Sequence, residues 1–136
     1  MLDIVRSVDG LKFVYDPANF IQCGQDSAKT IAALFDETAY FHVKDVIAAT
    51  QQLVPAGFGD GNIAEIVRRI DPKKEVVMTL EPHLAVFDGY AQIDNSEMKN
   101  KFNYPDNHAA FNAAVSALKD ILAACGYTET ADGFVK

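Results

Sequence analysis

Apolar residues follow two different spacings along the chain, and the two alternate. Three short runs rich in Val, Phe and Tyr have the composition of buried strands: Leu11–Asp16, Ala39–Asp45 and Glu75–Glu81. Between and after them, apolar residues recur every three or four positions, which is the spacing of an amphipathic helix. Helices are predicted over residues 26–37, 62–70 and 106–126, and residues 1–10 are predicted to be the last turns of another helix.

The order strand–helix, repeated three times, predicts an α/β fold with parallel strands and helices packed against the sheet. The period of two along each strand separates two faces. The bulkier, almost wholly apolar face is expected to pack against helices and comprises Phe13, Tyr15, Phe41, Val43, Met78 and Leu80. The opposite face carries Val14, Tyr40 and Thr79, together with three polar residues at the strand ends, Asp16, His42 and Glu81.

Composition limits the kind of protein and its partners. A chain of 136 residues with 49% hydrophobic residues is expected to form a single domain over 1–136. The net charge of −7 and the absence of any Lys/Arg run argue against nucleic acid or an anionic membrane as the main partner. No apolar run reaches the roughly 20 residues that span a bilayer. Two cysteines without paired spacing, and no signal peptide before Asp3, favour a reduced, cytoplasmic setting.

The three polar residues at the strand ends form the strongest candidate site. Each lies one strand–helix unit from the next, and neighbouring parallel strands, about 4.8 Å apart, end at the same edge of a sheet. The three side chains are therefore expected to converge. Taken singly, Asp16 before Pro17 is typical of a turn, and His42 of a hydrogen-bonded core residue. Together with Glu81 they form a mixed oxygen and nitrogen ligand set that suits a divalent metal such as Mn²⁺, Mg²⁺, Co²⁺ or Zn²⁺.

Four motifs in order carry a resemblance to a known family: VYDPANF, FHVKD, VPAGFGDGNI and TLEPHL. With this order and spacing the chain resembles the xylose isomerase-like TIM barrel superfamily, which includes sugar-phosphate isomerases and epimerases and the AP endonuclease family 2. The resemblance covers nearly the whole chain. It implies that the chain is the C-terminal portion of a (β/α)₈ barrel, holding strands six to eight, with a site at the C-terminal mouth.

The resemblance also implies roles for the site residues. Asp16, His42 and Glu81 match the metal ligands of the sixth, seventh and eighth strands, and Glu81 also matches a catalytic proton-transfer group. In such enzymes the metal polarises a sugar carbonyl and stabilises an enediolate while two carboxylates transfer the proton. The second carboxylate belongs to the fifth strand, which this sequence does not contain. Activity is therefore expected to require the N-terminal part of the barrel.

Further polar residues near the strand ends are candidate contacts to a small sugar or sugar-phosphate substrate. Asn19 stands where relatives often carry a substrate-binding His. Lys44 is interpreted either as a contact to a substrate oxygen or as a solvated charge. His83 is interpreted either as a substrate contact or as a group that orients Glu81. Asp45 is expected to cap a turn.

The glycine-rich segment GFGDG does not fit a dinucleotide fingerprint, because it follows a loop rather than a strand. Gly57, Gly59 and Gly61 are expected to give backbone freedom to a loop over the barrel mouth, with a substrate-facing role as a further option. Cys23 and Cys125 are interpreted as small buried or semi-buried residues with no base nearby in the sequence to activate them.

These observations favour a metal-dependent sugar or sugar-phosphate isomerase or epimerase. The alternative is a non-catalytic barrel portion with a role in structure or assembly. The phosphodiesterase branch of the superfamily needs more metal-binding His and Asp residues and a basic DNA-binding face, which an acidic chain with three histidines does not supply. A homo-oligomer is expected, because three strands of a barrel would leave two edges and one face open.

Overall fold

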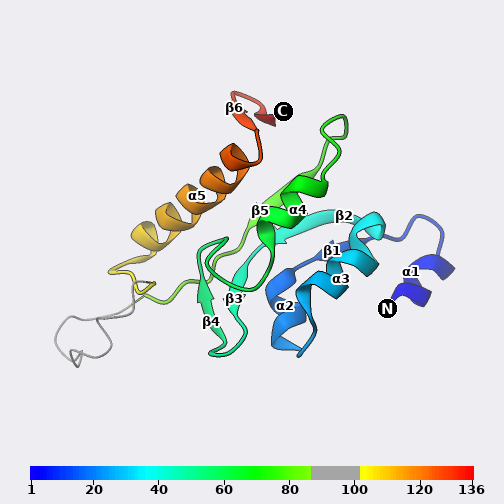
Figure 1. Ribbon diagram of the computed structural model, residues 1–136, viewed down its shortest axis with the longest axis horizontal. Coiled ribbons are helices and arrows are strands. Elements are labelled where there is room, and N and C mark those ends of the chain that lie inside the picture. Colours follow the sequence, from blue (N-terminus) through cyan, green and yellow to red (C-terminus); the bar gives the residue numbers. More distant parts are fainter. Residues whose placement is uncertain (87–101) are drawn as a thin grey trace.

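A parallel three-stranded sheet forms the centre of the fold (Figure 1). The computed structural model describes residues 1–86 and 102–136. In the sheet, β2 (Thr38–Val43) lies between β1 (Phe13–Tyr15) and β5 (Val77–Leu80), and it pairs with both in parallel. The predicted strands and their parallel arrangement in a mixed α/β fold are therefore confirmed.

The predicted helices are present as well. Their bounds are Leu2–Ser7 for α1, Ser27–Leu34 for α3, Ile63–Arg69 for α4 and Asn107–Ala124 for α5, with a 3₁₀ turn, η1, at Phe35–Glu37. Helices α3 and α5 each begin at an aspartate whose side chain accepts a hydrogen bond from a backbone N–H in the first turn. Asp26 accepts from Lys29 N at 2.8 Å, and Asp106 accepts from Ala109 N at 2.7 Å.

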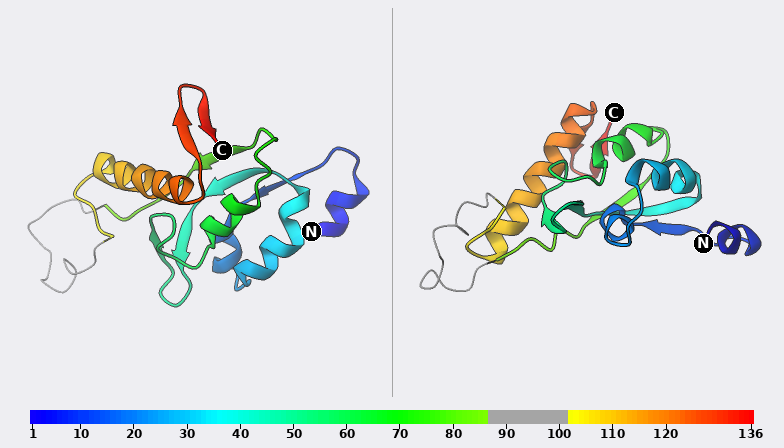
Figure 2. Two further views of the ribbon diagram at one scale, coloured as in Figure 1. Left: turned by 45° about the horizontal axis from the view of Figure 1, so that its top comes forward. Right: turned by 60° about the horizontal axis from the view of Figure 1, so that its bottom comes forward.

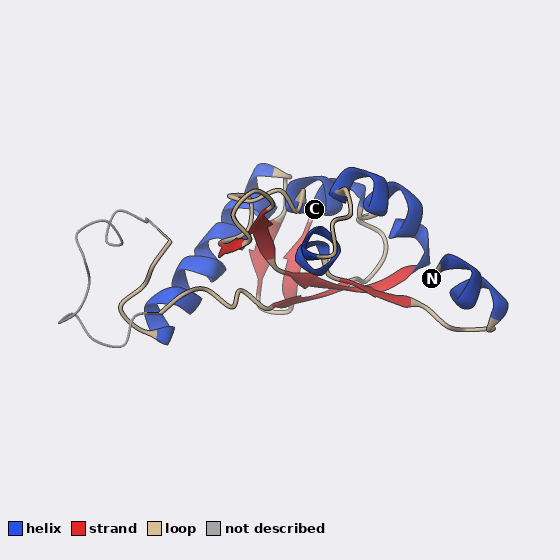
Figure 3. Ribbon diagram, turned by 90° about the horizontal axis from the view of Figure 1, so that it is seen from below, coloured by secondary structure: helices blue, strands red, loops and turns tan. Residues whose placement is uncertain are grey.

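The helices gather on one side of the sheet (Figure 3). Side chains of the sheet that face this side are buried or packed against the core: Phe13, Tyr15, Phe41, Val43, Met78 and Leu80. They pack with apolar residues of α3 and α4, among them Ile31, Ile63 and Ile66. On the opposite face, Val14 and Val77 are 53% and 56% exposed. The division into two faces agrees with the alternation in the sequence.

We call the uncovered side of the sheet the open face. Val14, Tyr40 and Val77 stand side by side across the three strands there, because Val14 pairs with Tyr40 and Tyr40 with Val77. His42 and Thr79 form the next cross-strand pair on the same face. The open face therefore runs from an apolar row to the polar strand ends.

Three short pieces of structure were not predicted. They are helix α2 (Pro17–Gln22), the antiparallel hairpin of β3 (Asp45–Ile47) and β4 (Gln52–Val54), and the C-terminal hairpin of β6 (Thr128–Thr130) and β7 (Gly133–Val135). Figure 2 shows the C-terminal hairpin, in red, beyond the end of α5. Segments of three to six residues are too short to show a hydrophobic period, which explains why the pattern missed them. Most of the predicted irregular stretch 85–104 lies outside the described residues.

The glycine-rich segment wraps around the carboxylate of Asp45, which is 1% exposed. One oxygen accepts hydrogen bonds from Val46 N at 2.9 Å and Gly61 N at 2.8 Å. The other accepts from Gly57 N at 2.8 Å and Gly59 N at 3.1 Å. Burial raises the pKa of Asp45, and the four backbone N–H groups act in the opposite direction. Asp45 was predicted to cap a single turn, but its carboxylate instead binds backbone N–H groups along the whole glycine-rich loop.

The glycines of this loop are needed for close approach to Asp45 and its neighbours. A Cβ atom on Gly59 would lie 2.6 Å from the carbonyl oxygen of Val46, and one on Gly61 would lie 2.7 Å from Oδ1 of Asp45. Gly57 has a φ of +86°, which favours glycine. These residues bind the buried carboxylate through their backbones, which is a more specific role than loop freedom.

We expect Asp45→Asn to lower the free energy of unfolding by about 2–4 kcal/mol, because the amide leaves two buried backbone N–H groups without an acceptor. Urea denaturation followed by circular dichroism would measure the change. Asp60→Asn is the matched control: Asp60 is exposed and accepts one backbone bond, from Ala48 N at 2.7 Å, which an asparagine oxygen can still accept. Equal stability of the two variants would contradict a structural role for the Asp45 carboxylate.

Candidate metal centre

Asp16 directly follows β1 and is the N-cap of α2. Its Oδ1 accepts a hydrogen bond from Asn19 N at 3.0 Å, and Pro17 occupies the first helical position, where a missing N–H costs nothing. This hydrogen bond fixes the orientation of the carboxylate, and the second oxygen, Oδ2, takes no part in the cap. Oδ2 is buried and has no hydrogen-bond partner among the described residues.

His42 and Glu81 come from the two neighbouring strands. His42 lies on the open face of β2, with its ring edge-on to that of Tyr40 at 5.1 Å between centroids. Glu81 follows β5, and its backbone N donates to Val43 O at 3.1 Å, which continues the parallel ladder by one residue. The parallel register therefore carries both side chains to the edge where β1 ends in Asp16.

The three side chains converge as predicted. His42 Nδ1 lies 3.2 Å from Glu81 Oε2 and 3.8 Å from Asp16 Oδ2. One potential ligand atom from each residue lies within 4.8 Å of the other two. Ligand atoms around one divalent ion are roughly 3–4 Å apart, because each bond is about 2.0–2.2 Å long. The arrangement, and the unpartnered buried oxygen of Asp16, fit a metal ion.

Lys44 and Asn19 join the same cluster. Lys44 is 9% exposed, and its Nζ donates a hydrogen bond to Asn19 Oδ1 at 2.8 Å. The same ammonium lies 3.7 Å from Asp16 Oδ2. Of the two interpretations of Lys44, a solvated surface charge does not agree with this burial. The buried cation balances one of the two carboxylates of the cluster.

His83 is placed differently. It is exposed, its backbone has a positive φ of 43°, and within the described segments its side chain makes no hydrogen bond or ion pair with the triad. A positive φ is uncommon for a residue other than glycine. The proposed contact of His83 with substrate remains a prediction.

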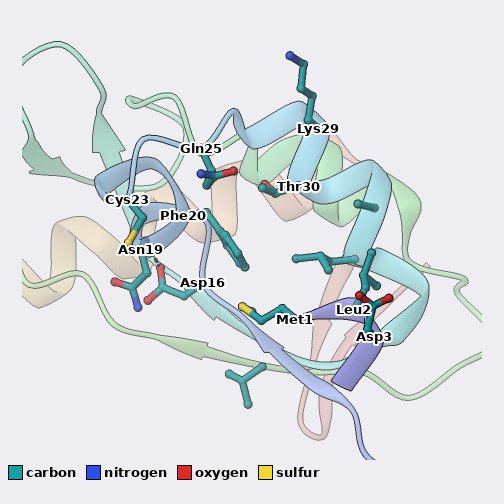
Figure 4. A pocket seen from close by; sticks show the side chains of 13 residues that line it. Met1, Leu2, Asp3, Asp16, Asn19, Phe20, Cys23, Gln25, Lys29 and Thr30 are labelled. Carbon is teal, nitrogen blue, oxygen red and sulfur yellow. Dashed lines mark hydrogen bonds between the residues drawn. The ribbon is translucent and has the colours of Figure 1, made fainter. Parts of the chain in front are cut away.

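A cavity of about 920 Å³ is lined by Asp16, Asn19 and residues of α1, α2 and α3, but not by His42, Lys44 or Glu81 (Figure 4). Asp16, Asn19 and Cys23 lie near one another at one end, and Phe20 and residues of α1 and α3 form the other walls. Cys23 is exposed, so the sequence interpretation of a buried or semi-buried residue is wrong for it, whereas Cys125 is buried. Of the three metal-ligand candidates, only Asp16 lines this cavity.

Comparisons of the chain with models of protein families, with curated proteins and with solved structures gave no match. In the described parts of the chain, no helix combines the length and the apolar character needed to cross a bilayer. The interpretation of the site therefore depends on its own geometry and chemistry.

Asp16→Asn should separate the two roles of Asp16. Asparagine caps helices as well as aspartate does, so both variants lose the carboxylate beside the buried Lys44, but only Asp16→Ala also loses the cap and should be less stable than Asp16→Asn by about 1 kcal/mol. Both variants should bind Mn²⁺ at least tenfold more weakly than the wild type, because neither supplies a carboxylate ligand. Thermal unfolding and calorimetric Mn²⁺ titration measure the two effects. Unchanged Mn²⁺ affinity of Asp16→Asn would remove Asp16 from the ligand set.

Proposed function

We propose that Asp16, His42 and Glu81 bind a divalent metal, and that the chain is the C-terminal part of a metal-dependent sugar or sugar-phosphate isomerase or epimerase. The observation that carries the proposal is the convergence of these side chains at the carboxyl edge of a parallel sheet. Asp16 Oδ2 supports it, because this buried oxygen accepts no hydrogen bond among the described residues and has only longer ion-pair contacts, to Lys44 Nζ and His42 Nδ1.

The barrel part of the proposal is supported by the order of the elements. Three parallel strands stand in sequence order in the sheet, and in the described part of the chain most helices lie on one side of it, with α1 beyond its end. A barrel has this asymmetry, since helices cover the outside and side chains fill the inside. The open face would then be the barrel interior, and the metal centre would lie at the C-terminal mouth.

The chemistry follows from the residue types. A bound divalent metal would supply an electrophile for the carbonyl and hydroxyl oxygens of a sugar. The Glu81 side chain is 33% exposed, so one carboxylate oxygen can bind the metal while the other accepts a proton from the neighbouring carbon. Epimerisation also needs an acid on the opposite face of that carbon. The resemblance assigns this role to a strand outside this sequence, so we expect little turnover by this polypeptide alone.

The metal proposal predicts that calorimetry detects Mn²⁺ binding to the wild type and a loss of about 100-fold in affinity for His42→Ala. Zn²⁺ should behave likewise, because both ions accept imidazole and carboxylate ligands. His108→Ala is the control, since His108 is exposed on α5 and is hydrogen-bonded only locally, to Asn112 at 3.1 Å. Equal Mn²⁺ affinity of His42→Ala and the wild type would refute the assignment.

A second proposal concerns assembly: a second copy of the chain covers the open face. Parallel sheets are normally covered on both faces, and here Val14 and Val77 are largely exposed in the apolar row with Tyr40. Both outer strands, β1 and β5, also have an unpaired edge among the described residues. A two-fold pairing of sheets would bury the row against its own copy.

Light scattering at micromolar concentration should therefore give the mass of an oligomer. Val14→Lys combined with Val77→Lys should shift the equilibrium to the monomer, because two like charges would meet across the two-fold axis. Lysines at the exposed positions Ala28 and Ala32 of α3 provide the control. A cooperative wild-type monomer with no tendency to associate would contradict this proposal.

A further inference from the structure

Lys44 places a resident positive charge beside the candidate metal ligands. Its ammonium lies 3.7 Å from Asp16 Oδ2 and donates a hydrogen bond to Asn19 Oδ1 at 2.8 Å. Because lysine has only donors, the oxygen of the Asn19 amide must face Lys44. The Asn19 side chain thereby holds the ammonium beside the Asp16 carboxylate.

The charge of the site follows from its members. The carboxylates of Asp16 and Glu81 contribute −2, the ammonium of Lys44 contributes +1, and a ligating His42 is neutral. With a divalent ion the sum is +1, whereas the triad and the ion without Lys44 would be neutral. Lys44 therefore adds to the attraction that the metal ion itself exerts on an anionic ligand.

Burial strengthens this attraction. Lys44 is 9% exposed, and charges interact more strongly away from bulk water. In the described structure only one hydrogen bond from its ammonium is found, the bond to Asn19. The ammonium has two further donors, and an anionic oxygen of a ligand can accept from them.

We propose, on the basis of the metal site of the proposed function, that the substrate is a hydroxy carboxylate of the sugar-acid type rather than a neutral sugar. The three protein ligands leave coordination positions open, and a hydroxyl oxygen and an adjacent carboxylate oxygen can fill two of them. The negative charge of the carboxylate then lies next to Lys44.

Glycolate and glycolamide test the charge preference, since they have nearly the same shape and chelating oxygens and differ in charge. Water-proton relaxation by protein-bound Mn²⁺ reports binding of either probe, because each displaces water from the ion. We expect the wild type to prefer glycolate by about tenfold more than Lys44→Met does, because only direct carboxylate coordination to Mn²⁺ favours glycolate in the variant. Lys44→Arg retains the charge and should retain part of the preference.

A second pair of variants avoids changing a buried residue. Asn19 is exposed, so Asn19→Asp should fold and should neutralise Lys44 in place, which lowers the preference for glycolate. Asn19→Leu removes the same hydrogen bond without adding charge and should keep most of the preference. If Lys44 only compensates Asp16 structurally, the ratio of glycolate to glycolamide affinity would be the same in all variants, and the proposal would be overturned.

The outcomes separate this proposal from the proposed function. Failure of the wild type to bind Mn²⁺ would remove the metal site and the substrate proposal together. Mn²⁺ binding that depends on His42, combined with equal affinity for glycolate and glycolamide, would overturn only the substrate proposal. Methyl phosphate provides the last comparison: binding tighter than that of glycolate would assign the positive charge to a phosphate group and overturn the carboxylate proposal.

Discussion

The packing around the candidate site depends on the hydrogen bonds that the buried Asp45 carboxylate accepts. Its four backbone hydrogen bonds join the start of β3 to the glycine loop, and Asp60 N in that loop also donates to Val46 O at 2.9 Å. The loop is also bonded to the start of α3, since Ser27 Oγ donates to Gly61 O at 2.9 Å. A buried charge is stable only when such donors surround it, so the loop and the carboxylate require each other.

The same loop lies against the first turn of α2, whose N-cap is Asp16. A Cβ atom on Gly61 would lie 3.4 Å from Cβ of Pro17, so the glycine backbone packs closely behind the helix start. Two neighbouring elements therefore fix the position of Asp16: strand β1, which precedes it, and the packed first turn of α2, which follows it. Asp16 Oδ2 is therefore held in place although it accepts no hydrogen bond among the described residues, and the ammonium of Lys44 lies 3.7 Å from it.

The features that could be predicted from the sequence are those that produce a regular spacing of apolar residues or a repeated order of strands and helices. Alternation in FVY and YFHV identified which face of the sheet is buried, and the regular spacing of strands brought Asp16, His42 and Glu81 to one edge. Helix α2 was overlooked although Asp16 and Pro17 form a recognised helix start, because an Asp before Pro is equally typical of a turn. The role of Asp45 could not be predicted, since a side chain that binds residues up to 16 positions away leaves no local pattern.

The open face connects the fold to the chemistry. Apolar Val14, Tyr40 and Val77 extend the same surface on which His42 lies, so any partner that covers that row also limits how much water reaches the candidate metal ligands. Proton transfer next to a metal needs a site from which bulk water is excluded, because fixed charges act weakly in a high dielectric. An uncovered sheet can bind an ion and a small anion, but its charges are screened. Covering the face, by barrel strands or by a second copy, would bury an apolar row and strengthen the electrostatics of Lys44 and the triad in one step. Assembly and catalytic competence would then be linked through a single surface, with hydrophobic burial supplying the driving force for both.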